Sequence, residues 1–201
     1  MLIIGINGSP NRTGNTAYLI QEGLKAAAST GAQTVLIHVT DVLADQKHPF
    51  CNQCSSPCQG SCSRGNRLGE AYDLLRRADG ILLGSPVYFG SVSAQLKAFW
   101  DKSRILRKEK ALLNVVGAAL AVGGSRFGGQ ETTLKALFDM MLVQGMMIIG
   151  DGYQDYDCGH HGGCSQAPAE EDEFARQRVR ILGLRLAEVA AATMSLRRRD
   201  L

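Results

Sequence analysis

The stretch LIIGINGSPNRTGNT, residues 2–16, decides the fold of this chain. It opens with an apolar run, residues 2–7, that has the length and composition of a buried strand. A polar turn follows, and a helix is expected from Gly14 to about Thr30, with Gly31 as its stop. Within this helix apolar residues recur near the 3.6-residue spacing, at Ala17, Leu19, Ile20, Leu24 and Ala27. The stretch is therefore expected to form the first strand, turn and helix of an α/β fold.

The same alternation of strands and helices continues along the chain. Further strands are expected at residues 34–39, 80–85, 114–122 and 146–150, and helices at 67–79, 93–103, 128–145 and 168–197. The last helix is expected to begin at Pro168, with acidic residues in its first turn. This alternation predicts a doubly wound parallel sheet of five strands, flavodoxin-like, in the order 2-1-3-4-5. We expect residues 1–201 to form a single domain, with a cysteine-rich loop at about 45–65 after the second strand.

The composition excludes several classes of protein. Apolar residues make up 45% of the chain and charged residues 20%, which is typical of a globular protein. The net charge of +3 is too small to indicate a nucleic-acid partner, and the basic run Arg197–Arg199 is expected to be a solvated helix end. No apolar segment reaches the roughly 18 residues of a membrane span, and no secretory signal is visible. We therefore expect a cytoplasmic protein with no membrane partner.

The first loop, residues 7–16, has the composition of an anion site. Ser9, Thr13 and Thr16 offer hydroxyl groups, and two asparagines and Arg12 add amides and a charge. Glycines let backbone N–H groups turn inward, and the following helix adds the positive end of its dipole. The loop lacks both Gly-Lys-Ser/Thr and GxGxxG, which favours a monophosphate ester such as FMN. A dinucleotide is an alternative ligand, because Asp41, near the end of the second expected strand, could bind its ribose. An ordinary capped turn between strand and helix, without a ligand, is the structural alternative.

Four of the six cysteines lie within twelve residues, CNQCSSPCQGSC, residues 51–62. In a reducing cytoplasm such a cluster indicates metal ligands or redox groups rather than structural disulfides. Zinc sites usually combine two separated CxxC pairs, whereas compact four-cysteine runs are typical of a [4Fe–4S] cluster. We therefore favour a [4Fe–4S] cluster, with zinc and thiol switching as alternatives. The expected ligands are Cys51, Cys54, Cys58 and Cys62.

Three loops together resemble the NADPH-dependent FMN reductase branch of the flavodoxin-like superfamily. They are GSPNRTGNT (8–16), GSPVYFGSVSAQLKAFWD (84–101) and AVGGSRFGGQETTL (121–134), which follow the first, third and fourth expected strands. The resemblance implies that the FMN phosphate is held by Ser9, Arg12, Gly14, Asn15 and Thr16. It implies that Pro86, Val87, Tyr88, Phe89 and Gly90 line the flavin ring and ribityl chain, with Gly123, Gly124 and Ser125 along another edge of the ring. No side chain is assigned as catalytic, because FMN would carry the chemistry.

With the cysteine loop included, the chain resembles the iron–sulfur flavoproteins of archaea and bacteria. Its last two gaps between cysteines hold three residues each, whereas the archaeal pattern has two residues between its second and third cysteines and a longer last gap. This resemblance implies an FMN-dependent oxidoreductase that also holds a [4Fe–4S] cluster. Electrons would enter from a ferredoxin or from NAD(P)H as co-substrate and leave to a small acceptor such as a quinone, an oxygen species or a flavin. A homodimer or homotetramer is implied as well.

Two other functions stay open at this stage. One is a plain NAD(P)H-dependent flavin or quinone reductase without a cluster, and the other is a non-catalytic electron carrier or thiol-based redox sensor. A further segment, DCGHHGGCSQAP (157–168), holds Cys158, His160, His161 and Cys164. We interpret it as a glycine-rich flap near the active edge, with a second metal site as the alternative. Trp100 lies in helical register with Leu96 and is expected in the core.

Overall fold

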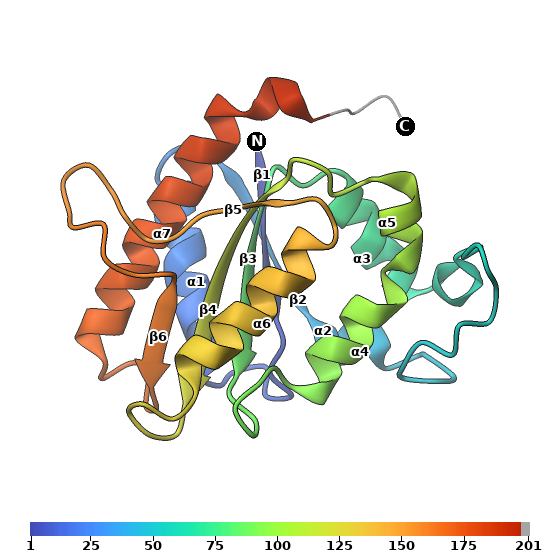
Figure 1. The fold of residues 1–201 in the computed structure, drawn as a ribbon, viewed down its shortest axis with the longest axis horizontal. Coiled ribbons are helices and arrows are strands. Elements are labelled where there is room, and N and C mark those ends of the chain that lie inside the picture. The colour runs from blue at the N-terminus through green and yellow to red at the C-terminus, as the bar shows by residue number, and fades with distance from the viewer. Residues whose placement is uncertain (198–201) are drawn as a thin grey trace.

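The computed structural model describes residues 1–197 and shows a parallel sheet between two layers of helices (Figure 1). The strands are β1 (Leu2–Asn7), β2 (Gln33–His38), β3 (Gly80–Pro86), β4 (Val116–Gly123), β5 (Met147–Ile148) and β6 (Gly163–Gln166). The helices are α1 (Asn15–Ala28), α2 (Val39–Leu43), α3 (Arg67–Arg76), α4 (Ala94–Lys102), α5 (Arg104–Glu109), α6 (Gln130–Leu142) and α7 (Glu173–Ala192), with short 3-10 turns at Ser61–Ser63 and Met194–Leu196. The order β2-β1-β3-β4-β5 confirms the predicted flavodoxin-like topology.

The outer edge of the sheet differs from the single strand expected at 146–150. β5 has only two residues and pairs with Val116 and Gly117, at the start of β4. β6 then pairs with Leu120–Gly123, at the end of β4, so two short strands share one edge. The chain returns closely at Gly162, where a Cβ atom would lie 2.4 Å from the Ala119 carbonyl oxygen. The four-residue sequence of β6, GCSQ, is too short and too polar to predict a strand from its apolar pattern.

The prediction that the last helix begins at Pro168 is wrong. The helix begins at Glu173, because Asp172 caps it: its Oδ1 accepts a hydrogen bond from the Ala175 N–H at 3.0 Å. The other carboxylate oxygen of Asp172 accepts from the Gln166 N–H at 3.0 Å and so ties the helix start to β6. A carboxylate that satisfies both groups is a stronger start signal than the proline before it.

The sequence predicts a solvated helix end for the basic run near the C-terminus, and the structure differs at its first residue, Arg197. Arg197 is buried and forms an ion pair with Asp79, at 3.1 Å, in which each side chain is only 3% exposed. Asp79 also accepts a hydrogen bond from the Leu2 N–H at 2.7 Å, at the beginning of the sheet. Arg198 and Arg199 lie outside the described residues.

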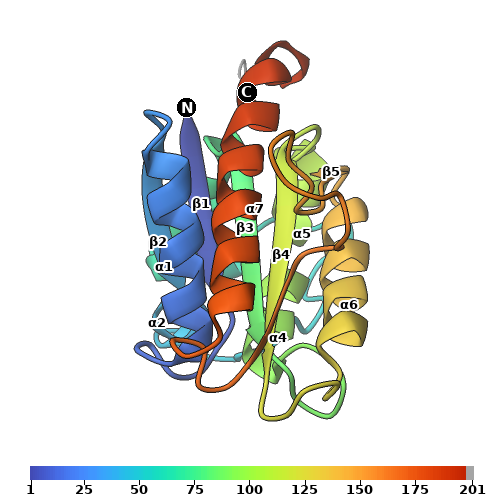
Figure 2. The same ribbon diagram turned by 90° about the vertical axis from the view of Figure 1, so that its left-hand side faces the viewer.

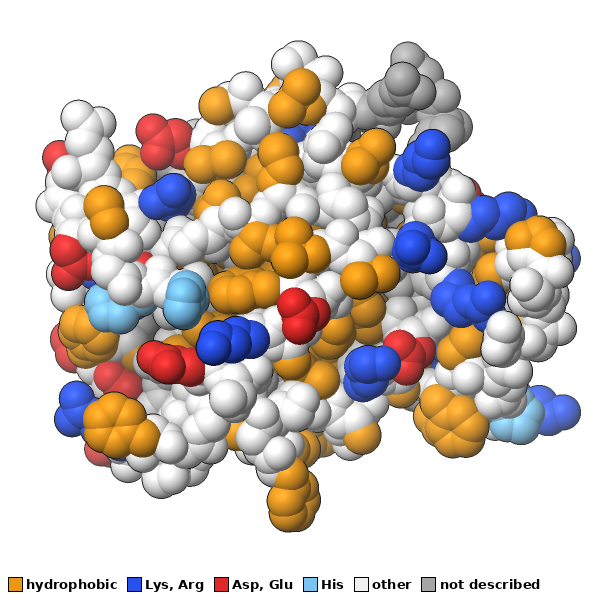
Figure 3. All heavy atoms as spheres, viewed as in Figure 1, with side chains coloured by type: hydrophobic (Ala, Val, Ile, Leu, Met, Phe, Trp, Pro, Cys, Tyr) orange, Lys and Arg blue, Asp and Glu red, His pale blue; other side chains and the backbone are white. Residues whose placement is uncertain are grey.

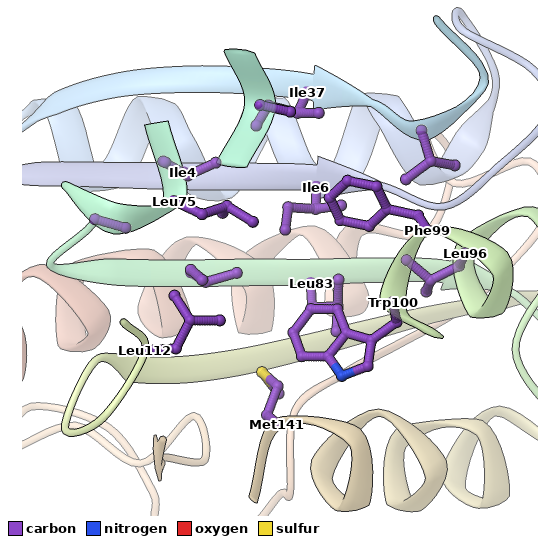
Figure 4. Close-up of a cluster of buried hydrophobic side chains, with 14 of the residues drawn as sticks. Ile4, Ile6, Ile37, Leu75, Leu83, Leu96, Phe99, Trp100, Leu112 and Met141 are labelled. Carbon is purple, nitrogen blue, oxygen red and sulfur yellow. The ribbon is translucent and has the colours of Figure 1, made fainter. Parts of the chain in front are cut away.

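Two hydrophobic cores lie on the two faces of the sheet. One joins the sheet to α3–α6, and Figure 4 shows how its side chains from strands and helices point toward one another. Trp100 packs there, and its indole N–H donates to the Met140 carbonyl at 2.9 Å, in agreement with the expected core position. The second core joins the sheet to α1 and α7, which lie side by side in Figure 2. Within residues 1–197 no helix is long and apolar enough to span a membrane.

The contact between α1 and α7 requires glycine. A Cβ atom on Gly183 would lie 2.1 Å from the carbonyl oxygen of Gly23, which is backbone and cannot move aside easily. We expect Gly183→Ala to lower the free energy of unfolding by about 1–3 kcal/mol through overpacking. Urea unfolding followed by circular dichroism measures this loss. Glu188→Ala, an exposed site on the same helix, serves as the control, and equal stability of the two variants would contradict the prediction.

Candidate functional site

The loops after β1, β3, β4 and β6 meet at the carboxyl edge of the sheet. The Gly8 N–H donates to the Gly84 carbonyl and the Val87 N–H to the Val122 carbonyl, each at 2.8 Å. The Ala167 N–H donates to the Gly123 carbonyl at 2.8 Å and brings in the loop after β6. The three loops that sequence analysis assigned to one ligand are therefore connected by hydrogen bonds. Ligands of open α/β sheets bind at this edge.

The first loop is shaped by its own polar side chains. The Ser9 N–H donates to Asn7 Oδ1 at 3.0 Å, and the Asn11 N–H donates to Ser9 Oγ at 3.1 Å. The Thr13 N–H in turn donates to Asn11 Oδ1 at 3.0 Å. Successive turns of this kind hold the backbone curled in front of α1. Asn7, which sequence analysis did not single out, is fully buried, and a polar residue that ends an apolar strand was the available signal.

The N-terminus of α1 has no side-chain cap. Its N-cap residue, Gly14, carries no side chain, and the first turn contains no acidic residue. By contrast α3, α4 and α7 are each capped by a side chain, from Asn66, Ser93 and Asp172 respectively. The first-turn N–H groups of α1 are thus left for an external acceptor, and the helix dipole favours an anion there. This end of the helix fits a phosphate group.

Two of the residues expected at the phosphate have partners within the protein. Arg12 forms an ion pair with Asp41 at 3.2 Å. Asn15 Oδ1 accepts a hydrogen bond from the Ala169 N–H at 2.8 Å and so joins the start of α1 to the loop after β6. Ser9 and Thr16 are buried at the loop.

His38, the last residue of β2, forms a hydrogen bond with Asn7, where the first loop begins. Its Nδ1 lies 3.0 Å from Asn7 Nδ2, so the ring nitrogen accepts the amide hydrogen bond. Burial lowers the pKa of His38, Asp41 opposes this effect and Arg12 adds to it. The low pKa favours the neutral ring that this hydrogen bond requires. The sequence offered no signal for His38, because its partner becomes adjacent only through the pairing of β1 with β2.

Aromatic side chains project from the loops after β3 and β4. Phe89 and Phe127 are essentially fully exposed, and their φ angles of 49° and 57° lie in the left-handed region. Tyr88 is 45% exposed beside them. The loop after β3 is held against the start of α6, since Thr132 Oγ1 of α6 donates to the Gly90 carbonyl at 2.9 Å. Figure 3 shows hydrophobic side chains that protrude from the lower edge of the molecule, where these loops lie in Figure 1. Strained exposed residues of this kind occur at binding sites.

The remaining expected ring contacts lie in the same two loops. Pro86 ends β3 and Gly123 ends β4, with Val87, Gly90, Gly124 and Ser125 just beyond. Gln130, which sequence analysis missed, holds the loop after β4 in place. Its side-chain amide donates to the carbonyl of Ser125 in that loop at 2.7 Å and to the carbonyl of Ser165 in β6 at 3.2 Å. This edge is open, and a hollow of about 340 Å³ lies elsewhere, between α3, α5 and the loop before α3.

The four clustered cysteines lie in the loop between α2 and α3, residues 44–66, hereafter the cysteine loop. In Figure 1 it projects beyond α4 and α5. Cys54 is exposed, the other three thiols are half-buried, and Cys58 and Cys62 pack against the core. Asn66 Nδ2 donates to the Cys62 carbonyl at 2.9 Å, and Lys108 Nζ donates to the Cys58 carbonyl at 3.2 Å. The loop is thus anchored to α3 and α5.

The thiols of this loop lie close enough to affect one another. Burial raises the pKa of Cys62, Lys102 opposes this effect, and Cys58 and Cys54 add to it. Burial also raises the pKa of Tyr72 well above its usual value, and the thiols of Cys62, Cys51 and Cys58 contribute. Among residues 1–197 no three ligating side chains are gathered tightly enough for a single metal ion.

The segment with Cys158, His160 and His161 does not lie at the carboxyl edge. Because β5 pairs with the start of β4 and β6 with its end, residues 149–162 connect these two levels of the sheet, and the carboxyl edge lies beyond β6. The expectation of a flap at the active edge therefore does not hold for these residues. Cys164 lies in β6, where burial, with the carboxylates of Glu131 and Asp151, raises the pKa of its thiol to about 12.

A buried ion pair anchors this segment to α7. Arg178 Nε lies 2.5 Å from Asp151 Oδ2, and its NH1 group lies 2.8 Å from Asp157 Oδ1. His160 Nδ1 lies 3.6 Å from the same Asp151 oxygen. The histidine is thus part of a structural network, which differs from the metal site considered as an alternative.

The family model described as NADPH-dependent FMN reductase matches residues 1–157. An iron–sulfur flavoprotein of Methanocaldococcus jannaschii is 42% identical, covering 94% of this chain and 97% of that protein. Another, from Methanosarcina thermophila, is 39% identical, covering 94% and 95%. A solved flavodoxin, a WrbA-like protein from Agrobacterium tumefaciens, superposes with a TM-score of 0.66 at 19% identity, covering 95% of this chain and 98% of that one. The chain therefore belongs to the NADPH-dependent FMN reductase family, in its iron–sulfur flavoprotein subgroup, and is a flavin-dependent oxidoreductase.

Proposed function

We propose that this oxidoreductase binds FMN at the carboxyl edge of the sheet and a [4Fe–4S] cluster on the cysteine loop. Electrons would pass between a donor, either a ferredoxin or NAD(P)H, and a small acceptor such as a quinone, an oxygen species or a flavin. The observation that carries this proposal is the uncapped N-terminus of α1, set behind a curled polar loop and next to two aromatic loops. The names of the relatives support the second cofactor.

The phosphate of FMN would be held by the first loop. Ser9, Gly14, Asn15 and Thr16 surround the uncapped helix end, where backbone N–H groups and hydroxyl groups can donate to an anion. Arg12 is exposed and forms its ion pair at the surface, so it can turn toward a phosphate at small cost. The charge of a phosphate would then complete a site that the protein leaves without an internal acceptor.

The flavin ring would lie between the two aromatic loops. Pro86, Val87, Tyr88, Phe89 and Gly90 would contact one side of the ligand, and Gly123, Gly124 and Ser125 another. Backbone N–H groups near glycine can approach the ring and adjust its reduction potential. When bound, FMN supplies both two-electron and one-electron transfer. The protein would orient the ring and leave one part accessible to a substrate, and its exposed aromatic side chains suit a planar one.

The cluster would be ligated by Cys51, Cys54, Cys58 and Cys62. The four cysteines lie within twelve residues of one loop, which is anchored at both Cys58 and Cys62 and places the thiols in one another's electrostatic field. A four-iron cluster transfers single electrons, which would connect a one-electron donor to the flavin. A homodimer or homotetramer stays a prediction, as does the identity of the donor.

The phosphate site can be tested by comparing FMN with riboflavin, which lacks the phosphate. We expect Thr16→Val to weaken FMN binding roughly tenfold or more, because a hydrogen bond to a charged group is lost. Riboflavin binding should not change. Flavin fluorescence quenching measures both dissociation constants. The control is Thr30→Val, just beyond the other end of α1, and equal losses for FMN and riboflavin would count against the phosphate assignment.

The cluster can be tested on protein purified without oxygen. We expect flavin absorption bands with a broad shoulder near ~400 nm, and about four irons and four acid-labile sulfides per chain. Replacing the four clustered cysteines by serine should remove iron and sulfide but leave FMN bound. Replacing Cys158 and Cys164 by serine is the control and should leave the iron content unchanged. Flavin bands with no iron, even after reconstitution, would refute the cluster and leave a plain flavin reductase.

A further inference from the structure

Helix α5 presents a row of positive charges beside the cysteine loop. Arg104, Arg107 and Lys108 follow one another at helical spacings of three and four residues, so they lie on one face of the helix. Ile105 and Leu106 lie on the opposite face and are buried. Arg107 and Lys108 are exposed, and Arg104 is half-buried. The outward face of α5 is therefore basic.

These three cations have no carboxylate partner within the protein. In residues 1–197 no carboxylate lies within ion-pair distance of any of them, and Arg107 Nε donates instead to the Val143 carbonyl at 3.0 Å. The one acidic residue of α5, Glu109, pairs with Arg76 of α3 at 2.9 Å. Like charges three or four residues apart on a helix repel and destabilise it. The row is thus unfavourable for the helix itself, which indicates a use outside the fold.

The cysteine loop extends this positive charge. Residues 46–66 contain Lys47 and Arg64, both exposed, and no acidic residue. Lys108 joins the loop to α5, because its ammonium group donates to the Cys58 carbonyl at 3.2 Å. Figure 3 shows Lys and Arg side chains gathered on the right-hand side of the molecule, where α5 and the cysteine loop lie in Figure 1. We call this face the basic surface, and its members are Lys47, Arg64, Arg104, Arg107 and Lys108.

The charges next to the basic surface are balanced. On α4, Lys97 pairs with Asp101 at 2.6 Å. On the other side, Glu70 and Asp73 line the hollow between α3 and α5, where the basic surface ends. The unpaired positive charge is therefore concentrated on the face that carries the four clustered cysteines.

The same face offers contacts to a protein partner. Phe50, directly before Cys51, is 59% exposed, and Cys54 is exposed as well. Protein interfaces commonly combine an apolar centre with a polar rim. Complexes for electron transfer between proteins are small and short-lived, and opposite charges accelerate their formation. Exposed apolar groups with unpaired cations around a proposed redox centre fit such a complex.

We propose that the basic surface is the docking site of an acidic electron-carrier protein, which reduces this protein through the cysteine loop. This inference rests on the proposed cluster and names the face at which its donor acts. One electron leaves the reduced carrier and enters the cluster, and no bond forms or breaks. The carrier's surface carboxylates supply the negative charge that the basic surface lacks.

The test uses a reduced acidic ferredoxin as the probe and the protein with both cofactors, purified without oxygen. The double variant Arg104→Gln/Arg107→Gln is compared with wild type and with Lys25→Gln/Lys135→Gln, which removes the same charge from exposed sites on α1 and α6. Stopped-flow absorbance follows the oxidation of ferredoxin. We expect the second-order rate constant of the first variant to fall about tenfold at low salt, because charge-steered association is lost. The control should stay within about twofold, and at ~1 M salt all three should agree.

A second measurement separates docking from damage inside the protein. A photoreduced deazaflavin is a small neutral reductant that needs no docking surface, and it should reduce wild type and both variants at equal rates. Slower reduction of Arg104→Gln/Arg107→Gln by this reagent would overturn the inference, as would equal rates with ferredoxin at low salt. Tighter binding of a duplex oligonucleotide than of ferredoxin would overturn it in favour of a nucleic-acid partner.

The docking site and the cluster can fail separately. A wild type without iron would refute the proposed cluster. Binding of oxidised ferredoxin, measured by isothermal titration calorimetry, needs no cluster and still tests the basic surface. We expect the same variant to weaken this binding about tenfold or more, from the loss of steering charges. A cluster-containing wild type that binds no ferredoxin would refute the docking site and leave NAD(P)H as the donor.

Discussion

The register between β1 and its two neighbours is the constraint on which the site depends. Asn7, the last residue of β1, lies opposite His38 of β2 on one side and Gly84 of β3 on the other. One buried amide can therefore bond to His38 and to the first loop together, while Gly8 reaches the Gly84 carbonyl. A shift of the pairing by one residue would place Asn7 on the opposite face of the sheet and separate the three loops.

The same strand ends connect the two cofactor regions. β2 ends at His38 and leads directly into α2, and the cysteine loop begins where α2 ends. Asp41, within α2, pairs with Arg12 of the first loop. Arg67, at the start of α3, donates through its backbone N–H to Asp45 at 3.2 Å and closes the loop at its base. Short elements with polar anchors thus keep the base of the cysteine loop near the edge where the flavin is proposed to bind.

Local patterns were enough to predict five strands, their order in the sheet and the longer helices, because buried strands and amphipathic helices differ in their periodicity. The short elements α2, α5 and β6 were not predicted. Local patterns were also enough to indicate the polar first loop and the clustered cysteines, whose residues are adjacent in the sequence. Contacts between distant segments could not be predicted in this way. Arg197 is buried against Asp79, 118 residues earlier in the chain, and Lys102 donates a hydrogen bond to Gln46, 56 residues earlier. The division of the outer strand into β5 and β6 depends on glycines that let the chain return to β4.

The packing of α7 on α1 has a consequence for how the protein is made. Of the helices described here, α1 is synthesised first and α7 last, yet their backbones come into contact at Gly23 and Gly183. Nascent chains fold as their segments become available. The side of α1 that α7 covers, which includes Gly23, stays uncovered until α7 has been synthesised. One complete core can form early, between the sheet and α3–α6, while the other waits for the final helix. The order of synthesis thus leaves this face of the sheet without its cover for longer than the other face.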